Sequence, residues 1–196
     1  MRPPGWPRKP RMCTPTREDL LNRCVEFHGH LCLGQVLGVR LALTGLELIG
    51  TREPRQMIVF IENDRCIADA IQIVTGTRIG RRSAKLVGYG KMAATFINTE
   101  IGLAYRVNVR QTGTNGGHGP EAFRQVLHVP DADLLAWRRV TVALRPEDLP
   151  GKPRSTVYCA RCHERVFDSR EVEGAAGPLC LSCASGAYYQ IVEPDA

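Results

Sequence analysis

Four cysteines near the C-terminal end of the sequence form two Cys-x-x-Cys pairs, Cys159 with Cys162 and Cys180 with Cys183. Residues 163–179 separate the pairs, a spacing typical of structural zinc sites. Each pair places two thiolates on one face of a tight turn, and two pairs complete a tetrahedron with no open coordination position. The pattern therefore predicts a structural zinc finger, which stabilises its own fold rather than carrying out chemistry.

A second group of chemically capable residues, His28, His30, Cys32 and Cys66, lies in the first third of the chain. In an extended segment, residues two apart point the same way, so His28, His30 and Cys32 are expected to share a face. Both cysteines lie where a helix is expected to begin, and a helix N-terminus lowers the pKa of a thiol. Such donors suit zinc or another borderline metal, so the group is a candidate second metal site.

Two other interpretations of this group stay open. Cys32 is a candidate catalytic nucleophile or redox thiol, with a histidine as its base. Alternatively, the histidines cap helices and the cysteines are inert, packed side chains. Asp69, one turn beyond Cys66, either orients a histidine or pairs with a basic residue such as Lys91.

Three helices and one strand must position these side chains. Thr16 is expected to cap a helix over residues 17–26. The helix predicted over residues 34–48 is too apolar for the surface and is expected to be central. Residues 57–62 are typical of a buried strand, and a third helix is predicted over residues 65–74.

The remaining elements mix helices and strands. Further strands are predicted over residues 92–98, 104–110 and 140–144, and short helices over residues 121–127 and 131–135. A basic, glycine-punctuated loop is expected before the first of these strands. Because the order shows no regular βαβ alternation, the sequence favours the α+β class.

Composition divides the chain into four parts. Residues 1–15, with five prolines and four basic residues, predict a disordered basic tail. Residues 16–145 are expected to form the core, and the proline-rich residues 146–156 a linker. Residues 157–190 contain the predicted Cys₄ zinc finger.

The cysteines and the hydrophobic pattern indicate a cytoplasmic protein. Four of the eight cysteines fall in the metal-binding pairs and the others are scattered, which argues against a disulfide framework and for a reducing compartment. No apolar run approaches the ~18 residues that a membrane-spanning helix needs, and no signal peptide is expected. We therefore expect neither membrane insertion nor secretion.

The positive charge of the chain is concentrated rather than spread evenly. The net charge is +6, and residues 78–91 contain three arginines and two lysines without an acidic residue. Such a patch can bind nucleic acid. Aromatic residues make up 6% of the chain and offer few surfaces for base stacking. Nucleic acid is therefore the weaker of the partner predictions.

Several motifs resemble the FmdE family, proteins similar to the FmdE component of formylmethanofuran dehydrogenase. The resemblance covers roughly residues 17–187 in the family's order. Its motifs are Phe27-His28-Gly29-His30-Leu31-Cys32-Leu33-Gly34 with Gly38 and Arg40, then residues 62–72, residues 76–91, and the finger with residues 168–170 and 177–180. The sequence departs from the family pattern at Leu33, where proline is usual, and at Thr77, where many members have a further cysteine.

The resemblance implies an α+β core with a mixed sheet, joined to a small treble-clef or zinc-ribbon module, and a homodimer. It implies a metal or thiol site built on His28, His30, Cys32 and Cys66. The implied function is that of a metal-binding accessory protein in molybdenum- or tungsten-dependent oxidoreductase metabolism, with such an oxidoreductase as partner. The alternatives are a small thiol-based enzyme that uses Cys32, and a regulatory nucleic-acid-binding module.

Overall fold

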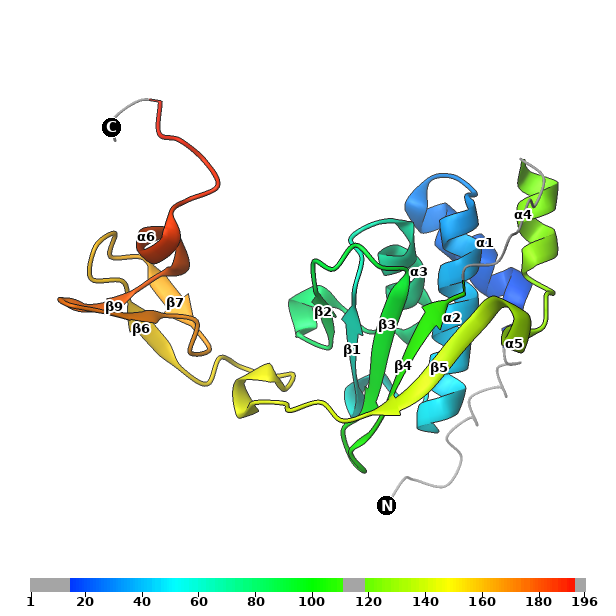
Figure 1. Cartoon of the computed structure of the whole chain (residues 1–196), viewed down its shortest axis with the longest axis horizontal. Coiled ribbons are helices and arrows are strands. Elements are labelled where there is room, and N and C mark those ends of the chain that lie inside the picture. The colour runs from blue at the N-terminus through cyan, green and yellow to red at the C-terminus, as the bar shows by residue number, and fades with distance from the viewer. Residues whose placement is uncertain (1–14, 111–118, 193–196) are drawn as a thin grey trace, which may run out of the picture. The chain divides into compact units, whose positions relative to one another are not determined.

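The first part of the protein is built around one five-stranded sheet (Figure 1). The structure is a computed structural model, and it describes residues 15–110 and 119–192. The chain divides into two units between Thr141 and Val142. The predicted tail, except Pro15, lies outside the described residues. No helix of the described residues is both long and apolar enough to cross a bilayer.

The sheet is mixed, as the family resemblance implied. Its strand order is β2-β1-β3-β4-β5, with β2 parallel to β1 and every other neighbouring pair antiparallel. The strands are β1 (Met57–Ile61), β2 (Ala84–Leu86), β3 (Ala93–Asn98), β4 (Leu103–Val109) and β5 (Leu135–Val140). The α+β class is therefore confirmed.

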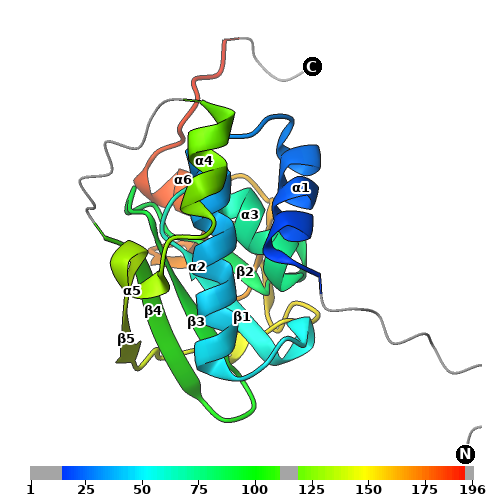
Figure 2. The same ribbon diagram turned by 90° about the vertical axis from the view of Figure 1, so that its right-hand side faces the viewer.

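Helices cover one face of this sheet, with α2 at the centre (Figure 2). The helices of this unit are α1 (Arg17–His28), α2 (Leu33–Ile49), α3 (Cys66–Thr75), α4 (Pro120–Val126) and α5 (Asp131–Leu134), with short 3-10 turns η1 (Pro54–Gln56) and η2 (Ile79–Arg81). The prediction that the second helix is central is confirmed, because most of α2 is buried.

Glycines let α2 approach its neighbours closely. A Cβ on Gly38 would lie 2.6 Å from the Cβ of Ala70 on α3, and a Cβ on Gly45 would lie 2.4 Å from the Phe96 ring on β3. Distances this short are not found between real side chains. The three first helices therefore form one tightly packed layer, which fixes where each of them begins.

The helix boundaries follow from their caps. Thr16 and Asp19 form a capping box at the start of α1, as the sequence predicted for Thr16. Gly29 ends α1 in the left-handed conformation at φ 91°, two residues after the predicted end. The short link between Gly29 and Leu33 then brings the end of α1 close to the start of α2.

Arg40, part of the first family-like motif, is a structural residue. It is buried within α2, and its guanidinium donates to the carbonyls of Val126, Leu127 and Val129 and pairs with Asp131. A cation suits the last carbonyls of a helix, which carry partial negative charge. Arg40 therefore fastens the end of α4 and the start of α5 to the central helix.

Two predictions about the strands were wrong. The strand expected over residues 140–144 is instead β5, which pairs with β4 from Leu135↔Val109 to Val140↔Ala104 and then ends. The buried Leu134 and Leu135 start this strand earlier than the apolar pattern suggested. The basic loop also contains the unpredicted β2, which pairs with β1 through backbone hydrogen bonds that its side-chain pattern does not reveal.

The second unit consists of two β-hairpins and a short helix. Strands β6 (Thr156–Tyr158) and β7 (Arg165–Phe167) form the first hairpin, and β8 (Val172–Gly174) and β9 (Gly177–Leu179) form the second. Helix α6 (Leu181–Ser185) follows directly, and the 3-10 turn η3 (Pro146–Asp148) lies within the predicted linker. This architecture is compatible with the small zinc module that the sequence predicted.

Candidate metal centres

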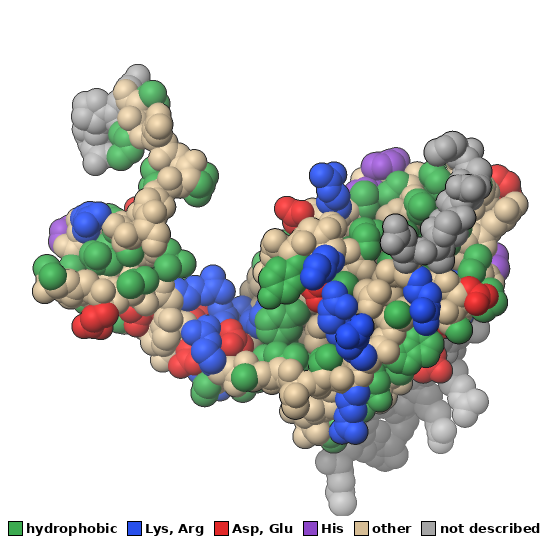
Figure 3. Space-filling model, in the orientation of Figure 1, with side chains coloured by type: hydrophobic (Ala, Val, Ile, Leu, Met, Phe, Trp, Pro, Cys, Tyr) green, Lys and Arg blue, Asp and Glu red, His purple; other side chains and the backbone are tan. Residues whose placement is uncertain are grey.

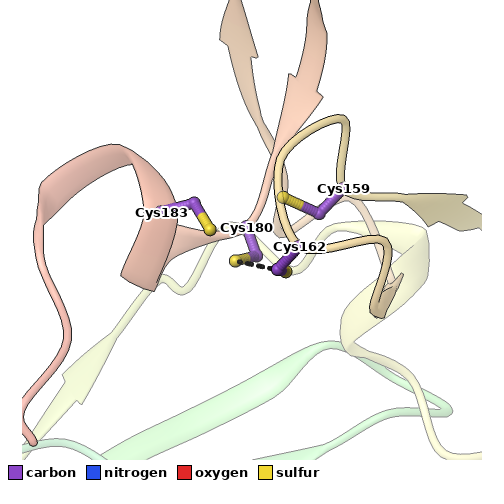
Figure 4. Close-up of side chains that lie close together, drawn as sticks. All are labelled: Cys159, Cys162, Cys180 and Cys183. Carbon is purple, nitrogen blue, oxygen red and sulfur yellow. Dashed lines mark hydrogen bonds between the residues drawn. The ribbon is translucent and has the colours of Figure 1, made fainter. Parts of the chain in front are cut away.

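The four cysteines of the second unit converge on one point (Figure 4). Cys159 and Cys162 come from the turn between β6 and β7, Cys180 is the N-cap of α6, and Cys183 lies within α6. Their sulfur atoms all lie within 4.8 Å of one another, and the Sγ atoms of Cys162 and Cys180 are 3.8 Å apart. Four sulfurs at these separations match the donor set of a closed tetrahedral zinc site.

The thiols of this group do not titrate alike. Backbone N–H groups of Cys162 and Cys180 lower the pKa of the Cys159 thiol to about 6. The neighbouring Cys180 sulfur raises the pKa of the Cys183 thiol to about 12. One thiolate therefore forms readily, whereas crowding of like groups opposes the last ones. A cation at the centre would remove this opposition, as metal binding to thiols requires.

In the first unit, three of the four predicted donors converge. One ring nitrogen of His28, the Cys32 sulfur and the Cys66 sulfur lie within 4.8 Å of one another, and all three residues are half-buried. His28 is the last residue of α1, Cys32 is the N-cap of α2, and Cys66 is the first residue of α3. The group therefore lies where one helix ends and two others begin. We call these three residues the core cluster.

Asp69 orients the histidine of the core cluster. Its Oδ2 lies 2.8 Å from Nδ1 of His28, so of the two sequence interpretations the structure realises the histidine partner. Lys91 instead lies over the Tyr89 ring, 5.6 Å from its centroid. A carboxylate that accepts from Nδ1–H leaves the lone pair on Nε2.

This Nε2 atom is what fits a metal ion. It is buried and has no hydrogen-bond partner among the described residues. Buried polar atoms are normally satisfied, so an orphaned ring nitrogen beside two sulfurs calls for a partner that accepts a lone pair. A bound zinc or similar ion would be held by His28, Cys32 and Cys66, and would act as a Lewis acid there.

His30 lies beside the core cluster, not within the group of three donors. Its ring is exposed and lies 4.6 Å from the His28 ring, between centroids. The expected extended run from His28 to Cys32 is wrong, because His28 is helical and Gly29 is left-handed. The two histidines therefore reach their positions through a helix end rather than through strand alternation.

The Cys66 thiol differs from the expectation for a helix start. Burial raises its pKa, and the adjacent Cys32 sulfur raises it further. These two effects outweigh the helix N-terminus, which favours thiolate. The thiol of Cys66 therefore keeps its proton at neutral pH unless a cation replaces that proton.

Gly34 and Gln35 support the core cluster from the first turn of α2, and the sequence analysis did not assign them this role. A Cβ on Gly34 would lie 2.8 Å from the Cβ of Cys66, and 3.5 Å and 3.7 Å from the sulfurs of Cys66 and Cys32. Gln35 is fully buried, and its Nε2 donates to the carbonyl of Cys66 over 2.7 Å. A glutamine in so apolar a helix was the available signal.

The two departures from the family pattern leave the core cluster intact. Leu33 is the first residue of α2, a position that proline favours but does not require. Thr77 is buried beyond the opposite end of α3, and its hydroxyl lies 2.7 Å from that of Thr75. Along a helix, Thr75 lies about 14 Å from Cys66. Thr77 is thus remote from the sulfur pair.

The basic segment of the first unit is partly engaged within the fold. The guanidinium of Arg78 donates to the carbonyls of Gln72 and Thr77. Figure 3 shows lysine and arginine side chains (blue) on the visible face of this unit, and histidine surface (purple) at the end where α1 turns into α2. The core cluster is therefore near solvent, at that end of the unit.

Comparisons with known proteins agree with these features. A family model described as "FmdE, Molybdenum formylmethanofuran dehydrogenase operon" matches residues 27–134. A relative from Archaeoglobus fulgidus, named "Probable S-adenosyl-L-methionine-binding protein", is 28% identical over 203 residues, which cover 88% of this chain and 54% of the relative. The chain thus spans about half the length of this relative.

A solved structure shares the fold. The crystal structure of an FmdE-like protein of tungsten formylmethanofuran dehydrogenase, from Syntrophus aciditrophicus, superposes with a TM-score of 0.63 at 23% sequence identity. The match covers 89% of this chain and 95% of that one. The motif in residues 27–34 thus lies at the start of the matched family region.

Proposed function

Since the chain belongs to the FmdE family, we propose that it is a metal-binding accessory protein of molybdenum- or tungsten-dependent oxidoreductase metabolism. The core cluster holds a functional metal ion, and the four cysteines of the second unit hold a structural zinc ion. The partner is an oxidoreductase of that class. The protein acts as a homodimer in the cytoplasm, where reducing conditions keep both sets of thiols available.

One observation supports this proposal above the others. The core cluster combines two sulfurs with an imidazole whose Nδ1 is held by Asp69 and whose Nε2 has no partner among the described residues. A carboxylate behind a ligating histidine is the usual arrangement at metal sites, because it fixes the tautomer and raises the basicity of the ligand.

The test is metal content per chain, measured by inductively coupled plasma mass spectrometry on full-length protein purified without a histidine tag. We expect two metal ions in the wild type and one in Cys32→Ser. His30→Ala is the matched control for His28→Ala: the former is expected to keep two ions and the latter to lose one. A single ion in the wild type and in every variant would contradict the proposal.

The same geometry favours a second candidate function, a thiol-based enzyme that uses Cys32. One ring nitrogen of His28 lies within 4.8 Å of the Cys32 sulfur, where it can serve as a base. This candidate predicts that iodoacetamide alkylates Cys32 selectively at neutral pH, and that added zinc does not protect it. The metal-binding proposal predicts the reverse, namely full protection by a bound ion.

A further inference from the structure

The two cysteine-containing groups differ in the number of donors that they supply. The second unit brings four sulfurs together, which completes a tetrahedral site. The core cluster brings together three donors from the described residues. Closed zinc sites have four protein ligands, whereas sites with three protein ligands keep one position for an external ligand. By donor count, the core cluster belongs to the second kind.

The core cluster is also accessible. Its three residues are half-buried, whereas Cys24, on the same helix as His28, is fully buried. The side chain of Asp69, behind the histidine, keeps 34% of its surface exposed. Residues that only stabilise a core have no need of such exposure. An external ligand can therefore reach the donors without unfolding of the helices.

The space beside the two sulfurs is kept free of a side chain by Gly34. A Cβ at this position would lie 3.5 Å from one sulfur and 3.7 Å from the other, and 2.8 Å from the Cβ of Cys66. Gly34 has no unusual backbone φ, so its lack of a side chain serves packing around the sulfurs. The sulfur pair thus sits against bare backbone.

We propose that the core cluster holds its metal ion with one position reserved for an external thiolate. The inference rests on the proposed function, because it requires a metal ion held by His28, Cys32 and Cys66. Thiolate is the class of ligand that the donor set favours: one more sulfur completes a Cys₃His set, a standard zinc combination. Soft sulfur ligands also select the same metals as the two cysteines already present.

The chemistry is ligand addition without oxidation or reduction. An incoming thiol loses its proton to solvent, and its sulfur becomes the fourth donor. No other bond breaks, and no electrons are transferred. A thiolate that belongs to a partner protein would dock that protein on the metal, whereas a free small thiol would act as an exchangeable ligand. Both sources share the same sulfur chemistry.

The experiment uses the full-length chain loaded with Co²⁺, whose thiolate charge-transfer absorption reports the number of bound sulfurs. The difference between wild type and Cys32→Ser isolates the contribution of the core cluster. The protein is titrated with 2-mercaptoethanol in one arm and with glutathione, a bulkier cysteine peptide, in the other. His30→Ala serves as the control that keeps all three donors.

A saturable increase in the wild type and in His30→Ala, absent in Cys32→Ser, is the expected result. Its size is roughly 1.5-fold, because the core cluster goes from two thiolates to three. A response to 2-mercaptoethanol alone identifies a small thiol, and a response to both identifies a site that also admits a polypeptide cysteine.

Two results would overturn the inference, and they are distinguishable. A core-cluster signal that does not change with either thiol, or that falls as cobalt is removed, leaves the metal-binding function standing but refutes the open position. A wild type with no core-cluster signal at any stage refutes the proposed function, and the inference with it.

Discussion

The contact between Asp69 and His28 gives the sharpest prediction, tested by Asp69→Asn. Asparagine keeps the size of the side chain but removes the charge that holds the Nδ1–H and makes Nε2 a better donor. Loss of such a partner usually weakens metal binding by about 10- to 100-fold. Because the Asp69 side chain is 34% exposed, solvent screens part of its effect. We therefore expect a loss of about tenfold, or about 1.4 kcal/mol.

The assay is a competition titration, in which a chromogenic chelator of known affinity removes zinc from the core cluster. The matched control is Asp64→Asn, which neutralises an exposed carboxylate five positions earlier in the chain. Asp69 also lies in the first turn of α3, so its neutralisation is expected to lower the free energy of unfolding by about 0.5 kcal/mol. Urea denaturation measures this contribution separately.

Two results would refute the reasoning. Equal zinc affinity in Asp69→Asn and wild type would show that the carboxylate does not tune the histidine. An equal loss in Asp69→Asn and Asp64→Asn would show a general effect of charge, without a role for the 2.8 Å contact.

Three further predictions concern packing, the second unit and pH. Gly34→Ala should lower the free energy of unfolding by about 1–3 kcal/mol in urea denaturation, because the new Cβ overlaps Cys66, whereas Gly80→Ala, with open space around it, should change it little. Cys162→Ser should release about one zinc ion and make the second unit sensitive to protease, with the first unit still resistant. Burial raises the pKa of the Cys24 thiol from 9.0 to about 12, so the unfolded chain loses this proton first as pH rises. Stability should therefore be constant with respect to this group below pH 9 and fall by about 1.4 kcal/mol per unit above it, a decline that Cys24→Ala should remove in urea titrations at several pH values.

The boundaries of the first three helices were predictable because local residues determine them. Thr16 accepts from the backbone at the start of α1, and Gly50 and Gly76 end α2 and α3 in the left-handed conformation. Glycine adopts this conformation without strain, so its position in the sequence marks a helix end. The start positions of Cys32 and Cys66 followed from these boundaries.

Strand pairing and the membership of the core cluster were less accessible. β2 has three residues and owes its place to hydrogen bonds with β1, 25 positions earlier at Val59↔Ala84. Likewise, His28 and Asp69 lie 41 positions apart, and only the packing of α1 on α3 brings them within 2.8 Å. Spacing in the sequence names the residue types of a site, whereas the tertiary fold selects which of them meet.

The pKa of Cys66 shows why this selection matters for function. A helix start alone predicts a thiolate, but burial and the adjacent Cys32 sulfur raise the pKa instead. Both sulfurs must be thiolates to bind a metal ion, so uptake at neutral pH has to expel the Cys66 proton. The folded core cluster is thus poised for binding that is coupled to proton release, and its affinity for zinc must fall as the pH is lowered. The same crowding that disfavours the free thiolate is relieved when a cation lies between the sulfurs.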